Sequence, residues 1–180
     1  MTDAGRVPTP TMRAPFDLGP MPAAAKMITR DEGIVRADPD AAFDVVRDVL
    51  RWPDRLPHYR FVRFRESDGQ GGGVVEMAAN CPFGPLNWPT WWLSHMQVTA
   101  AKRSVRFRHI GGITTGMDVE WTFEPHTEGT QVLLLHIWNG PNWPLIGAMA
   151  ATVVIGPVFV HGIASRTLAG LARIAEGGRR

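Results

Sequence analysis

The sequence predicts an α+β domain in which one curved antiparallel sheet wraps around a long C-terminal helix and encloses a cavity. Two observations carry this prediction. Between residues 26 and 138 most of the chain alternates apolar and polar residues as strands do, with one short helical segment near the start. Residues 144–176 form a long apolar segment that ends at Gly177-Gly178, a typical helix stop.

The composition narrows the class of protein. At 180 residues the chain is long enough to bury the core of one domain. The 19 Lys and Arg residues nearly balance the 17 Asp and Glu residues, so nucleic-acid binding is not expected and an apolar partner is. Cys81 is the single cysteine, which excludes an internal disulfide and favours a reducing, cytoplasmic location. Histidines and carboxylates lack metal-ligand spacing, so we expect no metal and no cofactor.

Residues 1–25 are expected to be a flexible leader ahead of a single domain of residues 26–180. This leader is rich in proline and has no continuous apolar stretch, so it does not resemble a signal peptide. The first strand is expected at residues 26–36. A short helix follows, because Asp38 can cap its first turn, Pro39 fits that turn, and apolar residues then recur at helical spacing from Ala42 to Leu50.

The rest of the predicted sheet follows in order. Strands are expected at residues 59–66 and 74–79, separated by a glycine-rich turn at 68–73. Residues 80–89 contain three prolines, each of which removes a backbone donor, so we expect a loop or a broken edge there. Further strands are expected at residues 91–99, 105–110, 117–123 and 130–138.

The C-terminal segment carries no Asp, Glu, Lys or Arg between Glu128 and Arg166. Its apolar run, residues 145–160, is shorter than the roughly 20 residues of a membrane span, and Gly156-Pro157 should kink it. We therefore expect a buried helix gripped by the sheet, with membrane contact as the alternative.

Strand parity predicts which side chains face the cavity. In residues 117–123 the odd positions are apolar and the even ones polar, so Val119, Trp121 and Phe123 should point inward with Met117. The same rule turns Phe107 and His109 inward with Val105, and leaves Arg106 and Arg108 in solvent.

Two strands are ambiguous. In the strand at 91–99 we favour the face with fewer polar groups, made of Trp92, Ser94, Met96 and Val98, over Trp91, Leu93, His95 and Gln97. In the last strand both faces are apolar: Val132, Leu134, His136 and Trp138 compete with Leu133, Leu135 and Ile137. The face that does not line the cavity could pack on a loop or on a partner subunit, so a homodimer is one option.

Several motifs resemble the START-like, helix-grip (Bet v 1/START, SRPBCC) superfamily, which includes bacterial polyketide aromatase/cyclases and coenzyme Q-binding START proteins. They are the Trp52-Pro53 to Tyr59 junction, Trp92-Leu93-Ser94, residues 103–106, residues 121–123 and Gly129-Thr130. The resemblance covers residues 26–176 and implies a hydrophobic ligand cavity, in the cyclases one for a poly-β-ketone chain. Trp52 and Tyr59 match the cyclase pattern, whereas Met96 stands where an arginine is expected.

Tyr59, His109 and His136 are the candidate catalytic residues. An aldol cyclisation needs a base for an α-proton and a donor for the enolate oxygen, which neutral histidine and tyrosine can supply. Alternatively, each histidine caps a backbone group and Tyr59 only packs. The candidate ligand-binding residues are Trp52, Trp92, Ser94, Met96, Phe107, Val119, Trp121 and Phe123.

Three functions follow from these residues: a polyketide aromatase/cyclase-like enzyme, which we prefer, a noncatalytic carrier of a quinone or other lipid, and an interaction domain with a filled cavity. Basic residues also gather on two predicted strands and a turn, namely Arg60, Arg63, Arg65, Lys102, Arg103, Arg106 and Arg108. They form either a solvated face or a docking surface for an acidic acyl-carrier protein or an anionic membrane.

Overall fold

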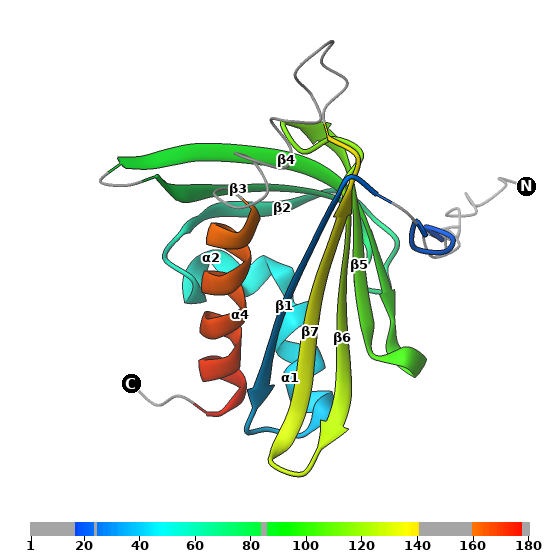
Figure 1. Ribbon diagram of the computed structural model, residues 1–180, viewed down its shortest axis with the longest axis vertical. Helices are drawn as coiled ribbons and strands as arrows, with labels where there is room; N and C mark the ends of the chain where they lie inside the picture. Colours follow the sequence, from blue (N-terminus) through cyan, green and yellow to red (C-terminus); the bar gives the residue numbers. More distant parts are fainter. Residues whose placement is uncertain (1–16, 24, 84–85, 141–159, 178–180) are drawn as a thin grey trace, which may run out of the picture.

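The computed structural model, which describes residues 17–23, 25–83, 86–140 and 160–177, has the predicted α+β architecture (Figure 1). One antiparallel sheet has the strand order β1-β7-β6-β5-β4-β3-β2. The strands are β1 (Met27–Val35), β2 (Tyr59–Ser67), β3 (Gly73–Phe83), β4 (Leu86–Thr99), β5 (Ser104–Gly112), β6 (Asp118–His126) and β7 (Gly129–Trp138).

The helices lie on the concave side of this sheet. Between β1 and β2 the chain forms α1 (Pro39–Arg47), a 3-10 turn (Val49–Arg51) and the short α2 (Trp52–Arg55). As the sequence predicts, Asp38 caps α1, because its Oδ1 accepts from the backbone N–H groups of Asp40 at 3.1 Å and Ala41 at 3.0 Å.

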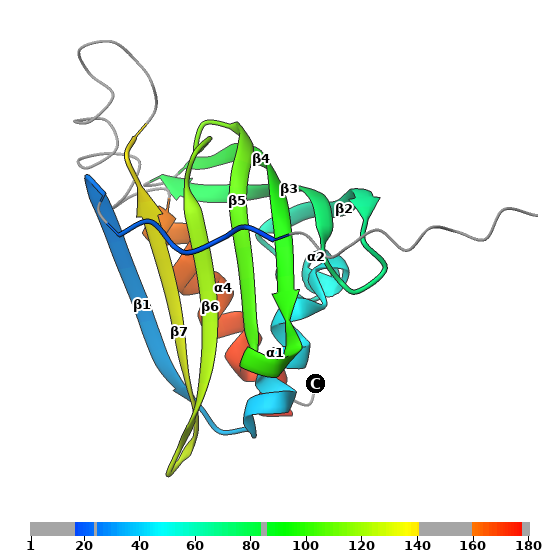
Figure 2. The same ribbon diagram turned by 90° about the vertical axis from the view of Figure 1, so that its right-hand side faces the viewer.

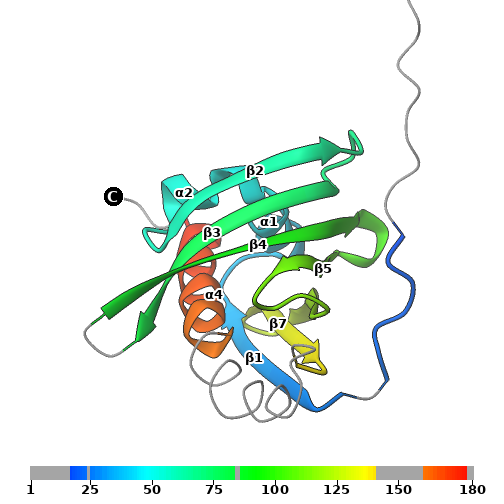
Figure 3. The same ribbon diagram turned by 90° about the horizontal axis from the view of Figure 1, so that it is seen from above.

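The sheet curls around α4 (His161–Ala175), which packs on β1, β3 and α1 (Figure 3). The expected helix residues before 160, with the kink at Gly156-Pro157, lie outside the described residues. None of the described helices is both long and apolar enough to cross a membrane.

Residues 80–83 and 86–89 of the proline-rich segment form a two-stranded ribbon, which differs from the expected loop or broken edge. β3 and β4 stay paired as far as Phe83 and Leu86. The neighbouring strands end earlier, because β2 pairs with β3 only up to Ala79 and β5 pairs with β4 only from Trp92. A ribbon with no third strand tolerates prolines, since its outer edges have no ladder to complete.

The structure also decides the two ambiguous strands. In β7, Val132, Leu134, His136 and Trp138 are buried. On the other face Leu133 and Leu135 are partly exposed, and only Ile137 is buried as well. In β4, Ser94 and Met96 are fully buried and Trp92 packs on the core, as favoured from the sequence.

The outer face of the sheet differs from its prediction at Arg106, which is only 9% exposed. Residues 17–23, part of the expected leader, cross that face (Figure 2). Arg106 donates to the carbonyl of Gly19 and, at 3.2 Å, to Met21 Sδ, and the backbone N–H of Leu18 donates to Gln97 Oε1 at 3.1 Å. The guanidinium is outward-facing but covered, because a segment distant in sequence lies over it.

Much of the expected basic surface is paired with acids. Arg63 and Arg65 both contact Glu76, Arg103 contacts Asp40, and Arg108 contacts Asp118. These pairs reduce the positive field that an acidic partner would recognise.

Candidate functional site

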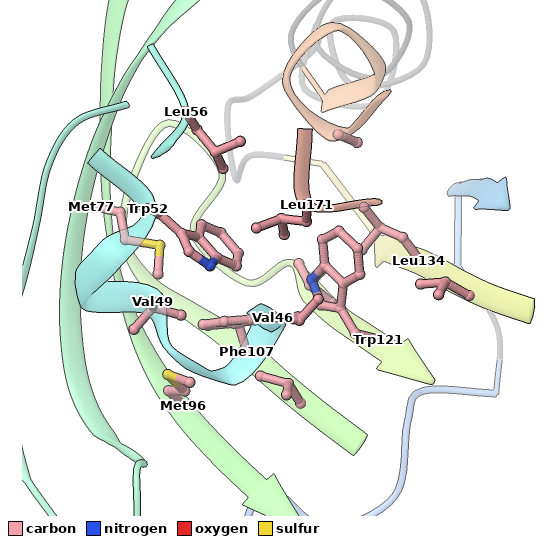
Figure 4. Close-up of a cluster of buried hydrophobic side chains, with 14 of the residues drawn as sticks. Val46, Val49, Trp52, Leu56, Met77, Met96, Phe107, Trp121, Leu134 and Leu171 are labelled. Carbon is pink, nitrogen blue, oxygen red and sulfur yellow. The ribbon is translucent and has the colours of Figure 1, made fainter. Parts of the chain in front are cut away.

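A cavity of about 90 Å³ lies between the concave face of the sheet, α2 and the first turns of α4. In Figure 4, Trp52, Phe107, Trp121 and Leu134 converge on one region from α2, β5, β6 and β7. The lining is mostly apolar: Trp52, Tyr59, Met77, Thr90, Trp91, Trp92, Phe107, His109, Ile113, Thr114, Met117, Val119, Trp121, Leu134, His136, Val160, Ile163, Ala164 and Thr167.

One wall is a cluster of aromatic rings in edge-to-face contact. The Trp52 ring centroid lies 5.1 Å from that of Tyr59 and 6.3 Å from that of Trp121, and Tyr59 lies 6.1 Å from Trp92. The turn between α2 and β2 produces this arrangement, because Leu56 N–H donates to the Trp52 carbonyl and Tyr59 N–H to the Leu56 carbonyl. Rings held in this way form a rigid surface suited to flat apolar ligands.

The Tyr59 hydroxyl is held from α4. Thr167 Oγ1 lies 3.4 Å from the Tyr59 hydroxyl and 3.0 Å from His58 Nε2, and it donates to the Ile163 carbonyl at 2.8 Å. Because the single Thr167 proton is used by Ile163, its oxygen accepts from the other two groups. Burial raises the pKa of Tyr59, so its hydroxyl stays protonated near neutral pH.

His109 lies on β5 between Trp92 and the turn that follows. Its ring is stacked on Trp92 with centroids 5.9 Å apart, and its Nδ1 lies 2.6 Å from Thr114 Oγ1. Burial, helped by nearby His136, lowers the pKa of His109 to about 3, so the imidazole is neutral at physiological pH. Its Nε2 has no hydrogen-bond partner among the described residues.

His136 contributes a second imidazole from β7. Its Nδ1 lies 3.2 Å from Thr29 Oγ1 on β1, and it is opposite Val119 in the sheet register. The three candidate catalytic residues therefore line one cavity from three different strands.

Five of the eight predicted ligand-binding residues line the cavity: Trp52, Trp92, Phe107, Val119 and Trp121. The other three, Ser94, Met96 and Phe123, are buried outside its lining. Met96 lies beside Val49 in Figure 4, at the end of the cluster away from Leu56. Phe123 packs edge-on against Phe43 of α1, 5.7 Å away. Parity gives the correct face of a strand but does not say how far along the strand the cavity extends.

Sequence reasoning missed the polar partners of the site, which are Thr114, Thr167 and His58. Thr114 lies in the β5–β6 turn, two residues after the end of β5, and Thr167 lies four residues after Ile163 on an apolar helix. Neither pattern indicates a site. His58 directly precedes Tyr59, which is the only available signal. No cluster of three or more metal-binding side chains occurs in the part of the chain that the structure describes.

Comparisons with known proteins identify the family and the fold. A family model described as polyketide cyclase / dehydrase and lipid transport matches residues 35–158. No curated protein sequence matches the chain.

Solved structures show the same fold. The Zhui aromatase/cyclase from Streptomyces sp. R1128 is 22% identical, with a TM-score of 0.65 over 83% of this chain and 93% of that one. TTHA0849 from Thermus thermophilus is 18% identical, with a TM-score of 0.70 over 86% and 100%. A START superfamily protein from Mycobacterium smegmatis is 14% identical, with a TM-score of 0.58 over 83% and 94%. The fold is the helix-grip fold that the sequence resemblance implied.

Proposed function

The chain belongs to the polyketide cyclase / dehydrase and lipid transport family, and from this premise we propose that it acts as an aromatase/cyclase-like enzyme on a hydrophobic, polyketide-derived molecule in its cavity. One observation carries the proposal. The Tyr59 and His109 rings both contact the Trp92 indole, so a phenolic hydroxyl and an imidazole flank one flat apolar surface. This pairs a hydrogen-bond donor with a base around a place where a conjugated ligand can stack.

The proposed reaction is an intramolecular aldol condensation. His109 carries its proton on Nδ1, which donates a hydrogen bond to Thr114 Oγ1. The free Nε2 then accepts a proton from a ligand carbon that lies between two carbonyls. When the ligand is bound, the Tyr59 hydroxyl turns its single proton from Thr167 Oγ1 to the enolate oxygen that forms. The enolate carbon then attacks a second carbonyl, whose oxygen takes up the proton from His109, and loss of water from the new ring gives the aromatic product.

The low pKa of His109 is compatible with this role. Burial favours the neutral imidazole, which is the form a base needs. When the enolate forms beside the ring, its negative charge stabilises the imidazolium in this low-dielectric site. The pKa of His109 therefore rises at the step in which it takes up the proton. His136 is the second candidate base, from the neighbouring wall.

A second function is a noncatalytic carrier of a quinone or other lipid. It is favoured because the titratable side chains in and beside the cavity are uncharged. Burial lowers the pKa of His109 and His58, to about 3 and about 4, and raises that of Tyr59, so all three are uncharged near neutral pH. A cavity of this kind solvates an apolar molecule without needing to transform it.

The first experiment is solvent extraction of the purified protein and mass spectrometry of the extract. An aromatic polyketide supports the enzyme, and a quinone or phospholipid supports the carrier. The second follows the absorbance of aromatic product from a synthetic poly-β-ketone thioester. The enzyme predicts that Tyr59→Phe lowers the rate about a hundredfold, whereas Phe61→Leu, on the outer face of the same strand, leaves it unchanged. Equal rates in wild type and Tyr59→Phe would exclude the proposed role of Tyr59.

A further inference from the structure

The ribbon formed by residues 80–83 and 86–91, here called the proline ribbon, extends beyond the neighbouring strands of the sheet (Figures 1 and 3). Trp88 and Trp91 lie on it three positions apart, so their side chains point to opposite faces. Trp88 is 56% exposed and Trp91 50% exposed. The ribbon therefore presents a large aromatic side chain to solvent on each of its faces.

Two further exposed apolar residues lie beside it, Ile110 at 39% and Ile113 at 41%. Ile110 lies near the end of β5 and Ile113 at the start of the β5–β6 turn. A Cβ on Gly111, between them, would lie 3.6 Å from the Trp91 ring. Four of the seven large apolar side chains that are exposed in the described residues thus belong to the ribbon and this turn. Trp91 and Ile113 also line the cavity, so this apolar region adjoins the cavity.

Charge is excluded from the same region. The sequence has no Asp, Glu, Lys or Arg between Glu76 and Lys102, nor between Arg108 and Asp118. Arg60 contacts the ribbon only where it joins the sheet, by donating to the carbonyl of Thr90 at 3.1 Å. Elsewhere on the sheet, cations and acids alternate and form pairs.

These features distinguish between kinds of partner. An acidic carrier protein needs basic side chains, which the ribbon lacks, and a protein partner or a second copy would cover one face of the ribbon and leave the other tryptophan in water. A lipid interface surrounds both faces, and tryptophan is enriched there because its ring is apolar and its N–H is polar. Pro82 and Pro89 further reduce the number of backbone donors that would need water.

We propose that the proline ribbon docks into the headgroup layer of a lipid bilayer, with Trp88 and Trp91 as its anchors and Ile110 and Ile113 beside them. Arg60, at the base of the ribbon, then lies at the level of the lipid phosphates. Because the anchors are uncharged, zwitterionic lipid is sufficient. Docking would bring the end of the cavity that Trp91 and Ile113 line to the bilayer surface.

The test is flotation of the full chain with phosphatidylcholine vesicles. Wild type should bind, and the bound fraction should change little between about 0.1 and about 1 M salt, because no ionic attraction is involved. The double variant Trp88→Ala/Trp91→Ala should bind about tenfold more weakly, since two half-exposed indoles no longer enter the interface. Leu50→Ala, an exposed apolar residue on the 3-10 turn before α2, is the matched control and should bind as wild type does.

Three results would overturn the proposal: no flotation of wild type, equal flotation of wild type and the double variant, or binding that requires anionic lipid and is lost at high salt. Thermal unfolding of the double variant verifies that its fold is intact. Trp88→Glu, which places a charge at a 56% exposed position, gives an independent loss of binding. The outcome does not depend on the proposed reaction, because vesicle binding is measured without any substrate.

Discussion

The imidazole of His109 lies parallel to the indole of Trp92, with 15° between the ring planes and 5.9 Å between the centroids. This stacking occurs because a bulge shifts the register of β4 and β5 between Leu93 and Ser94, so that Ser94 is opposite His109 while Leu93 is opposite Gly111. It removes one face of the imidazole from solvent, while Thr114 fixes Nδ1. The histidine is therefore buried, neutral and oriented.

The first prediction concerns the pH dependence of stability. The pKa of His109 is about 3 in the folded protein because of burial, and about 6.5 in an unfolded chain. Below pH 6.5 the unfolded state binds a proton that the folded state does not. The free energy of unfolding should therefore fall as the pH falls, by up to about 1.4 kcal/mol per pH unit from this residue.

Urea unfolding of wild type and His109→Gln at pH 7 and pH 5 measures this effect. The variant should lose less stability than wild type over that interval, which separates His109 from the carboxylates that titrate in both proteins. The His109 ring signals in NMR should not titrate between pH 8 and pH 5. A midpoint near pH 6.5 would show that the ring is solvated.

The second prediction concerns Thr167, whose hydroxyl joins α4 to the start of β2. Thr167→Val keeps the shape but leaves the Tyr59 hydroxyl and His58 Nε2 without their acceptor, and should cost about 1 to 3 kcal/mol of unfolding free energy. Thr167→Ser keeps the hydroxyl and should cost about 1 kcal/mol for the lost methyl group. If Thr167→Val loses no more stability in urea unfolding than Thr167→Ser does, the hydroxyl is not the acceptor that Tyr59 and His58 need.

Much of the fold could be predicted from the sequence because its signals are local. The cap at Asp38, the parity of β6 and the glycine turn before β3 each depend on a few adjacent residues. The faces of β7 could not be predicted, since both are apolar and only the position of α4 distinguishes them. The pairing of residues 80–83 with 86–89 was not predicted, because prolines prevent a third strand from pairing but allow a two-stranded ribbon.

In the candidate site too, local patterns could be predicted and contacts between distant residues could not. Tyr59, His109 and Trp92 were found from a junction motif and from alternation along strands. Thr114 and Thr167 were not found, because a threonine acquires its role here only from the ring that folding brings next to it. The burial of Arg106 was missed for the same reason, since Gly19 is distant in sequence.

The third prediction concerns Gly112, the last residue of β5, which pairs with Trp92 of the cavity lining. It has a φ of +95°, and a Cβ there would lie 2.5 Å from the Trp91 carbonyl oxygen. Gly112→Ala therefore combines backbone strain with a contact that cannot relax, and should cost about 2 to 4 kcal/mol in urea unfolding. Gly69→Ala, at a φ of +75° with open space around it, is the matched control and should cost about 1 kcal/mol. Similar costs for the two variants would contradict the close approach of β4.

The fourth prediction concerns Arg106, which holds residues 17–23 on the outer face of the sheet. Arg106→Met removes the donors to the Gly19 carbonyl and to Met21 Sδ, so this segment should detach more often. The rest of the sheet should tolerate the change, because Asp118 keeps Arg108 at 2.8 Å. Thermolysin cleaves before large apolar residues, so cleavage next to Leu18 and Met21 should become about tenfold faster when local opening costs about 1.4 kcal/mol less.

Arg103→Met is the control for this experiment, because Arg103 pairs with Asp40 and contacts neither Gly19 nor Met21. It should leave the cleavage rate as in wild type. If Arg106→Met is cleaved no faster than this control, then Leu18, buried against the sheet and bonded to Gln97, is what holds the segment. In that case Leu18→Ala should release it where Arg106→Met does not.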